Sequence, residues 1–76
     1  MAKYFVVTDG KEAVTALDGE RRARKMTKLA ASAREKDTGQ QYNRMLKRYD
    51  VRLSAFIRYL DVIGYDMVLV ERRPGA

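Results

Sequence analysis

The sequence predicts a small, mainly α-helical domain of about four helices with two short β-strands at its ends. Apolar residues recur at helical spacing through most of the chain, and the strongest such pattern stops at a glycine. Two runs rich in β-branched and aromatic residues, 3–7 and 66–71, flank the helical part and are typical of strands. With 76 residues, the chain is expected to form a single domain, 1–76, with a small core.

The composition argues against enzymatic and metal chemistry. The chain has no cysteine and no histidine, so it lacks thiolate and imidazole ligands and the commonest general base. We therefore expect no catalytic activity, no cofactor and no metal. No uncharged run approaches the roughly 20 residues of a membrane span, and the N-terminus lacks the apolar region of a signal peptide. We expect a cytoplasmic protein without a membrane partner.

The first half of the chain predicts one strand and two helices. After the strand at 3–7, Asp9 and Glu12 have the spacing of a capping box, and the following apolar residues form the stripe of a short helix. Asp18 and Gly19 are expected to end this helix, with Asp18 capping a second helix over 19–35. The basic side of that second helix carries Lys25 and Lys28, which face either phosphates or solvent.

A third helix is predicted over 38–49, with Thr38 as its N-cap and Gln41 completing the box. Its apolar stripe consists of Tyr42, Met45, Leu46 and Tyr49, and its opposite side carries Gln40, Arg44 and Lys47, with Asn43 and Arg48 on the flanks. Amides pair with adenine edges, and guanidinium groups pair with guanine or phosphate. This face therefore fits either a DNA major groove or ordinary solvent.

The fourth helix is predicted over 53–63, with a C-terminal glycine at Gly64. Its stripe of Leu53, Phe56, Ile57, Leu60 and Ile63 is expected to face the core. A second apolar strip of Ala55, Tyr59 and Val62 is expected to form a dimer contact, with a second layer of the monomer core as the alternative. The two strands are expected to pair with each other or across a dimer.

Positive charge is concentrated in the middle of the chain. The net charge is +6, and between Glu20 and Tyr49 ten basic residues stand against three acidic ones, a local charge of +7. Such a distribution indicates a surface that binds a polyanion. The candidate nucleic-acid contacts are Lys25, Lys28, Thr38, Gln40, Gln41, Asn43, Arg44, Lys47 and Arg48.

Residues 43–70, NRMLKRYDVRLSAFIRYLDVIGYDMVLV, resemble the C-terminal half of phage-repressor and Cro-type helix-turn-helix domains. The resemblance rests on Leu53-Ser54, Phe56-Ile57, Leu60, Ile63-Gly64-Tyr65 and the run 67–70. It implies that 26–33 is a positioning helix and 38–49 a recognition helix that places Gln40, Gln41, Asn43 and Arg44 near bases. The family has a glycine turn with a buried aliphatic residue between these helices, and 34–37 contains neither.

The expected function is therefore a sequence-specific DNA-binding transcriptional regulator of phage-repressor type, working as a homodimer by occupying double-stranded operator DNA. Two alternatives remain at the level of sequence. The basic run Arg44-Met45-Leu46-Lys47-Arg48 is similar to RNA-binding helices of the signal-recognition-particle M domain, so the partner is alternatively RNA. The second alternative is a protein-binding regulator, such as an antitoxin or a phage-encoded inhibitor, whose basic surface binds an acidic protein.

Overall fold

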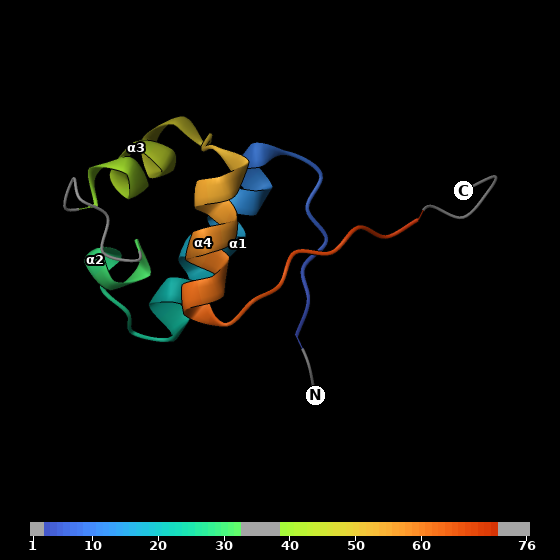
Figure 1. Ribbon diagram of the computed structural model, residues 1–76, viewed down its shortest axis with the longest axis horizontal. Helices are drawn as coiled ribbons and strands as arrows, with labels where there is room; N and C mark the ends of the chain where they lie inside the picture. Colours follow the sequence, from blue (N-terminus) through green and yellow to red (C-terminus); the bar gives the residue numbers. More distant parts are fainter. Residues whose placement is uncertain (1–2, 33–38, 72–76) are drawn as a thin grey trace.

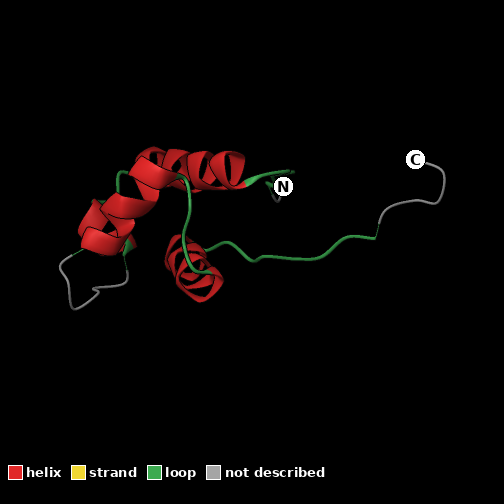
Figure 2. Cartoon of the chain, turned by 90° about the horizontal axis from the view of Figure 1, so that it is seen from above, coloured by secondary structure: helices red, strands yellow, loops and turns green. Residues whose placement is uncertain are grey.

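The computed structural model describes residues 3–32 and 39–71. These ranges contain four helices, α1 (Gly10–Ala23), α2 (Lys28–Ala31), α3 (Gln40–Arg48) and α4 (Leu53–Ile63) (Figure 1). The longest, α1, packs against both α3 and α4, and α2 packs against α4. In the view from above, α4 is seen nearly end-on beside the other helices (Figure 2). The predicted helical class is thus confirmed.

The first helix begins as predicted and ends later. The side chain of Asp9 accepts a hydrogen bond from the backbone N–H of Glu12 at 2.8 Å, and Glu12 in turn accepts one from the N–H of Thr8 at 3.2 Å. The expected end at Asp18 and Gly19 is wrong, because α1 continues to Ala23. The carboxylate of Asp18 pairs with Arg21 and Arg22, one turn further along α1. Because it is engaged there, it does not compete for the backbone N–H groups of the helix, and the helix continues past it.

The predicted helix over 19–35 is also wrong, because its residues belong to two helices with a turn between them. The turn contains Lys25 in the left-handed region, with φ 56°. Thr27 then caps α2 by accepting a bond from the N–H of Ala30 at 3.1 Å. Residues 33–35, the last part of the predicted helix, lie outside the described residues.

The third and fourth helices lie where the sequence predicts them. α3 begins after Gly39, which is left-handed with φ 85°, while the expected cap Thr38 lies outside the described residues. α4 ends at Gly64, also left-handed with φ 84°, so the predicted C-terminal glycine is confirmed. A side chain at that φ would be strained, which accounts for glycine at this helix end.

The face that α4 turns toward the core matches the predicted one only in part: Phe56 and Ile63 of the predicted stripe are buried, but other members are not. Ala55 and Tyr59 are 2% and 0% exposed in a single chain, so they belong to the monomer core and the prediction that they form a dimer contact is wrong. Val62, the third residue of that strip, is 37% exposed. Leu53 and Ile57, expected in the core, are 62% and 46% exposed. Because Tyr59 faces the core, its ring lies edge-on against that of Tyr42, with ring centroids 5.2 Å apart.

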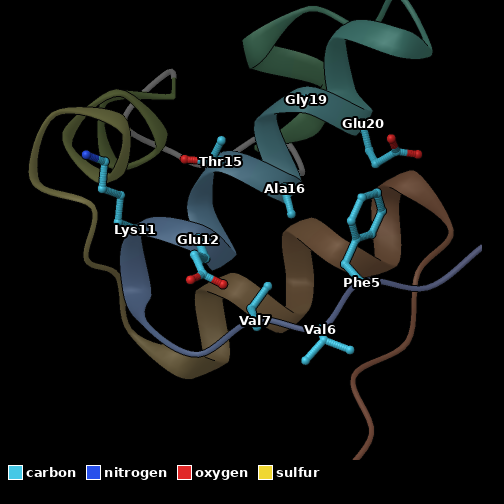
Figure 3. Close-up of a pocket in the computed structure, with 9 residues that line it drawn as sticks. All are labelled: Phe5, Val6, Val7, Lys11, Glu12, Thr15, Ala16, Gly19 and Glu20. Atoms are coloured by element: carbon cyan, nitrogen blue, oxygen red, sulfur yellow. The ribbon is translucent and has the colours of Figure 1, made fainter.

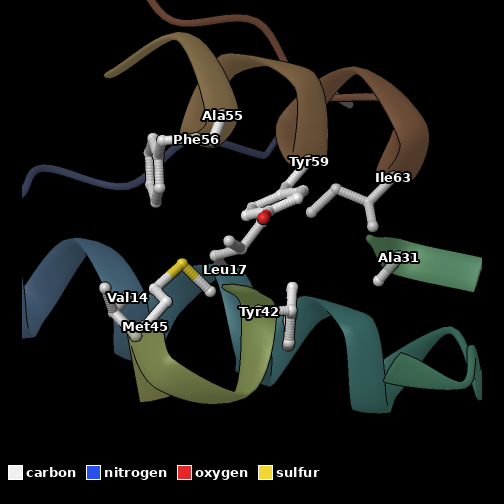
Figure 4. Packing of buried hydrophobic residues seen from close by; sticks show 9 residues of the cluster. All are labelled: Val14, Leu17, Ala31, Tyr42, Met45, Ala55, Phe56, Tyr59 and Ile63. Atoms are coloured by element: carbon white, nitrogen blue, oxygen red, sulfur yellow. The ribbon is translucent and has the colours of Figure 1, made fainter. Parts of the chain in front are cut away.

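All four helices contribute to the hydrophobic core (Figure 4). The largest buried side chains are two tyrosines, and the remaining space is filled by aliphatic residues, a methionine and two alanines. The core residues are Val14, Leu17, Ala31, Tyr42, Met45, Ala55, Phe56, Tyr59 and Ile63. Because every helix supplies part of it, the core holds α3 at a fixed position on the other helices.

The two predicted strands are not formed. Residues 3–8 and 65–71 are extended, but neither segment pairs in a ladder, so the described part of the chain contains no strand. The N-terminal segment lies against the helices, and the C-terminal one runs away from them (Figure 1). A strand requires a neighbour for its backbone groups, and neither segment has one among residues 3–32 and 39–71. No helix among the described residues is long and apolar enough to cross a membrane.

Two glycines of α1 provide a matched test of this packing. A Cβ atom on Gly10 would lie 2.7 Å from the carbonyl oxygen of Tyr49, whereas one on Gly19 would meet nothing within 4 Å. Gly10→Ala should therefore lower the free energy of unfolding by about 1–3 kcal/mol through the clash. Gly19→Ala should raise it by about 0.5–1 kcal/mol through better helix propensity. Urea unfolding of both variants measures these changes. If the two substitutions changed the free energy of unfolding in the same direction, the close approach of α1 to the end of α3 would be contradicted.

Candidate nucleic-acid interface

The third helix has one buried side and one exposed polar side. Tyr42 and Met45 are 0% and 1% exposed and face the core. The opposite side carries exposed polar residues, namely Gln40, Asn43, Arg44 and Lys47, with Arg48 exposed beside them and Gln41 partly buried. The structure thus brings most of the predicted contact residues onto one side of one helix.

This side offers hydrogen-bonding groups of two kinds. Gln40 and Asn43 carry amides, which both donate and accept, so they match the acceptor N7 and the donor amino group on the major-groove edge of adenine. Arg44 carries a forked guanidinium that suits the two acceptors of guanine, and Lys47 is a mobile point charge that suits phosphate. Such a set can read bases and bind the backbone at once.

The middle of α3 is attached to α1 by a buried polar network. The hydroxyl of Tyr42 donates to Asp18 Oδ1 at 3.1 Å. The same carboxylate accepts a hydrogen bond from Arg21 Nε at 2.7 Å and forms an ion pair with Arg22 Nε at 3.1 Å, and its side chain is only 9% exposed. Arg21 also donates to the backbone carbonyl of Met26 at 2.9 Å, which fixes the turn after α1. One carboxylate therefore joins α1, the following turn and α3.

The network sets the protonation of its members. Burial alone would raise the pKa of Asp18, but the hydrogen bonds from Arg21 and Tyr42 and the two guanidinium charges outweigh it, so this pKa lies below 3.8. Burial, together with the Asp18 charge, raises the pKa of the Tyr42 hydroxyl far above its ordinary value. At neutral pH the carboxylate is therefore charged and the phenol remains a donor.

Both ends of α3 are held as well. At its start, a Cβ on the buried Gly39 would lie 3.7 Å from the Ser32 hydroxyl and 4.0 Å from Leu29 Cα, so α3 begins against the end of α2. At its end, Tyr49 is left-handed with φ 54°, and the ammonium of Lys11 lies 5.4 Å from the centre of its ring. The exposed side of α3 is consequently presented on a helix that is fixed along its length.

The remaining predicted contacts lie on other elements. Lys25 is exposed in the turn after α1, and Lys28 is exposed as the first residue of α2. The helices α2 and α3 lie at the same end of the molecule (Figure 1). Lys28 therefore lies on a helix at the same end of the molecule as α3, Lys25 lies in the turn before that helix, and the predicted N-cap Thr38 lies outside the described residues.

Sequence reasoning missed the central role of Asp18, which it treated as a helix breaker. The signal was present, because Arg21 and Arg22 follow Asp18 at i+3 and i+4, the spacing of ion pairs within one helix. The contact with Tyr42, 24 residues away, had no local signal. Comparison of the chain with protein-family models, curated proteins and solved structures gives no match.

The network predicts a pH-dependent contribution to stability. Because the folded state holds the pKa of Asp18 below 3.8, this contribution is present above that pH and is lost as the pH falls through the folded pKa. Asp18→Asn should lower the free energy of unfolding by about 1.5–3 kcal/mol at neutral pH, and the difference from the unmodified protein should narrow as the pH falls below 3.8. Urea unfolding at several pH values measures this.

Asp61→Asn is the matched control, since it removes an exposed carboxylate of α4 that lies outside the network. It should change the free energy of unfolding by less than about 0.5 kcal/mol at neutral and at acidic pH. If Asp18→Asn were as stable as the unmodified protein at neutral pH, the network would not be what attaches α3 to α1.

Proposed function

We propose that this protein is a sequence-specific DNA-binding transcriptional regulator that inserts α3 into the major groove of duplex DNA. The observation that carries the proposal is the exposed side of α3, where Gln40, Asn43 and Arg44 project from a helix whose other side is buried in the core. Base-reading side chains must be held in a fixed orientation to discriminate between bases. The Asp18 network and the two held ends supply that constraint.

The dimensions of α3 suit the groove. An α-helix with its side chains is about 10–12 Å across, and the major groove of B-form DNA is about 12 Å wide, so a helix such as α3, with nine residues, can lie in it. The deep, narrow major groove of A-form RNA does not admit a helix in this way. A rigid helix with amides and a guanidinium on one side therefore favours duplex DNA over duplex RNA.

The surrounding positive charge supports affinity rather than specificity. The stretch between Glu20 and Tyr49 has a charge of +7, and exposed Lys28, Lys47 and Arg48 lie on α2 and α3. Contacts of such residues with phosphates release counterions and are independent of base sequence. On this basis Gln40, Asn43 and Arg44 select the site, the lysines bind the backbone, and regulation follows from occupancy of an operator.

Duplex binding should be steeply salt-dependent. Each neutralised phosphate adds about 0.9 to the slope of log affinity against log salt concentration, so several basic contacts give a slope of several units. Fluorescence anisotropy with a random duplex and with single-stranded and duplex RNA of equal length, from about 50 to 200 mM salt, measures the slope and the preference. Absence of duplex DNA binding at low salt, with binding to RNA or to an acidic protein, would refute the proposal.

Substitutions should separate specificity from affinity. A preferred site is first selected from a pool of random duplexes. Arg44→Ala and Gln40→Ala should each weaken binding to that site by about 1–3 kcal/mol and change random-duplex binding little. Lys28→Ala should weaken both duplexes alike and lower the salt slope by about one unit.

Arg58→Ala is the matched control for loss of one positive charge, because Arg58 is exposed on α4 rather than on α2 or α3. It should leave the preference for the selected site intact. Equal losses on specific and random duplexes for Arg44→Ala would make α3 a general basic surface, and the assignment of α3 as the recognition helix would then be wrong.

A further inference from the structure

The N-terminal segment, residues 3–8, lies on the helices in the manner of a single unpaired strand. Its side chains alternate, since Phe5 and Val7 are 47% and 44% exposed while Tyr4 and Val6 are 83% and 77% exposed. Figure 3 shows Phe5 and Val7 turned toward the helices and Val6 turned away. This alternation is the period of a β-strand with one covered face. The segment therefore has strand geometry without a strand beside it.

The C-terminal arm, residues 66–71, is an extended apolar segment that leaves the body of the molecule (Figure 1). Val68, Leu69 and Val70 are 74%, 99% and 82% exposed, so the arm packs on almost nothing in its own chain. Soluble proteins rarely leave such an edge open, because its free N–H and C=O groups and apolar side chains promote association. The arm thus requires a partner.

We propose that the C-terminal arm of one copy pairs antiparallel with the N-terminal segment of a second copy, in a reciprocal exchange that makes a two-fold symmetric dimer. One register places apolar residues opposite apolar residues along the whole overlap. The pairs are Lys3 with Glu71, Tyr4 with Val70, Phe5 with Leu69, Val6 with Val68, Val7 with Met67, and Thr8 with Asp66.

One polar end of this register is complementary in charge. Lys3 faces Glu71, whereas at the other end Asp66 faces Thr8, whose hydroxyl already donates to Glu12 at 2.9 Å in its own chain. Lys3 already lies 3.2 Å from Glu20 within its own chain, and its side chain is 62% exposed, so its ammonium has donors for a second carboxylate. Pairing two arms with each other at the centre of the 66–71 run would instead place Asp66 opposite Glu71, two like charges. Charge therefore favours the N-terminal segment as the partner.

A hollow beside the N-terminal segment fits the arm. It has a volume of about 480 Å³ and is lined by Phe5, Val6, Val7, Lys11, Glu12, Thr15, Ala16, Gly19 and Glu20 (Figure 3). Directly opposed residues of an antiparallel pair point to the same side. Leu69 and Met67 would therefore point with Phe5 and Val7 toward the helices, where this hollow lies.

The face of the pair that turns toward the helices has apolar surface to cover, because Phe5, Val7, Met67 and Leu69 are 47%, 44%, 46% and 99% exposed in a single chain. Within one chain, Tyr65 lies beside Phe5, with ring centroids 6.1 Å apart. The register places Asp66, the residue after Tyr65, opposite Thr8 rather than beside Phe5. An arm of the same chain therefore does not fit this register while Tyr65 stays beside Phe5. A second copy supplies the arm without disturbing that contact.

Engineered cysteines test the register directly, because the chain has no cysteine of its own. Val6 and Val68 are opposite each other in the proposed ladder, at a separation that a disulfide can span. When Val6→Cys and Val68→Cys chains are mixed and oxidised, the mixed disulfide should exceed the share expected from random collision. Tyr4→Cys mixed with Val68→Cys, two residues out of register on the same side, should give only that random share.

Three outcomes would overturn the proposal. An intrachain disulfide in monomers of the Val6→Cys/Val68→Cys double variant would show that the segments pair within one chain. Efficient crosslinking of Val68→Cys chains with Leu69→Cys chains would show that two arms pair with each other, because these residues oppose each other when the 66–71 runs pair antiparallel. Equal crosslinking in and out of register would show that the segments meet only by collision.

Sedimentation provides a second measurement without engineered thiols. Leu69→Asp should raise the dimer dissociation constant at least about tenfold, with the far-ultraviolet circular dichroism unchanged. Ile57→Asp is the control, because Ile57 is an exposed apolar residue of α4 outside both segments, 46% exposed. Loss of the dimer by Ile57→Asp but not by Leu69→Asp would place the interface on α4 and overturn the exchange. Neither measurement involves DNA, so both outcomes are independent of the proposed function.

Discussion

The buried carboxylate of Asp18 is the constraint on which the arrangement of the helices depends. It lies in the middle of α1 and binds Arg21, Arg22 and the hydroxyl of Tyr42. A buried charge is tolerated only when its hydrogen-bonding capacity is filled. Any rotation of α3 that removed the Tyr42 hydroxyl would leave the carboxylate short of a donor in a site where water is largely excluded. The network therefore specifies how α3 sits on α1 more than it adds to total stability.

A domain of this size relies on close approach at a few points rather than on a thick core. A small residue permits such an approach at Gly10, where a Cβ would lie 2.7 Å from the carbonyl oxygen of Tyr49. The ring of Tyr42 is fully buried and packs edge-on against Tyr59 of α4. The exposed side of α3 inherits this rigidity, which links the packing of the core to the proposed reading of DNA.

The sequence predicted those elements whose signals are local. The spacing of Tyr42 and Met45 located α3 and its exposed side, and Gly64 marked the end of α4. The failures share one cause, which is that a distant contact decided between two local options. Asp18 looked like a helix end because its partner Tyr42 is 24 residues away. α4 offered two apolar strips, and its core face takes Ala55 and Tyr59 from one and Phe56 and Ile63 from the other, with Tyr59 edge-on against the distant Tyr42.

The unpaired terminal segments are a failure of a different kind. The run containing Val68 and Leu69 has the composition of a strand, and it is extended, yet the ladder is absent. Composition records how well side chains fit a pleated sheet, and it does not say which chain supplies the neighbouring strand. A polar, glycine-rich tail could remain extended in water at no cost, whereas a tail with Leu69 at 99% exposure cannot. The persistence of apolar residues on both segments is therefore most simply explained by a partner strand from outside the chain.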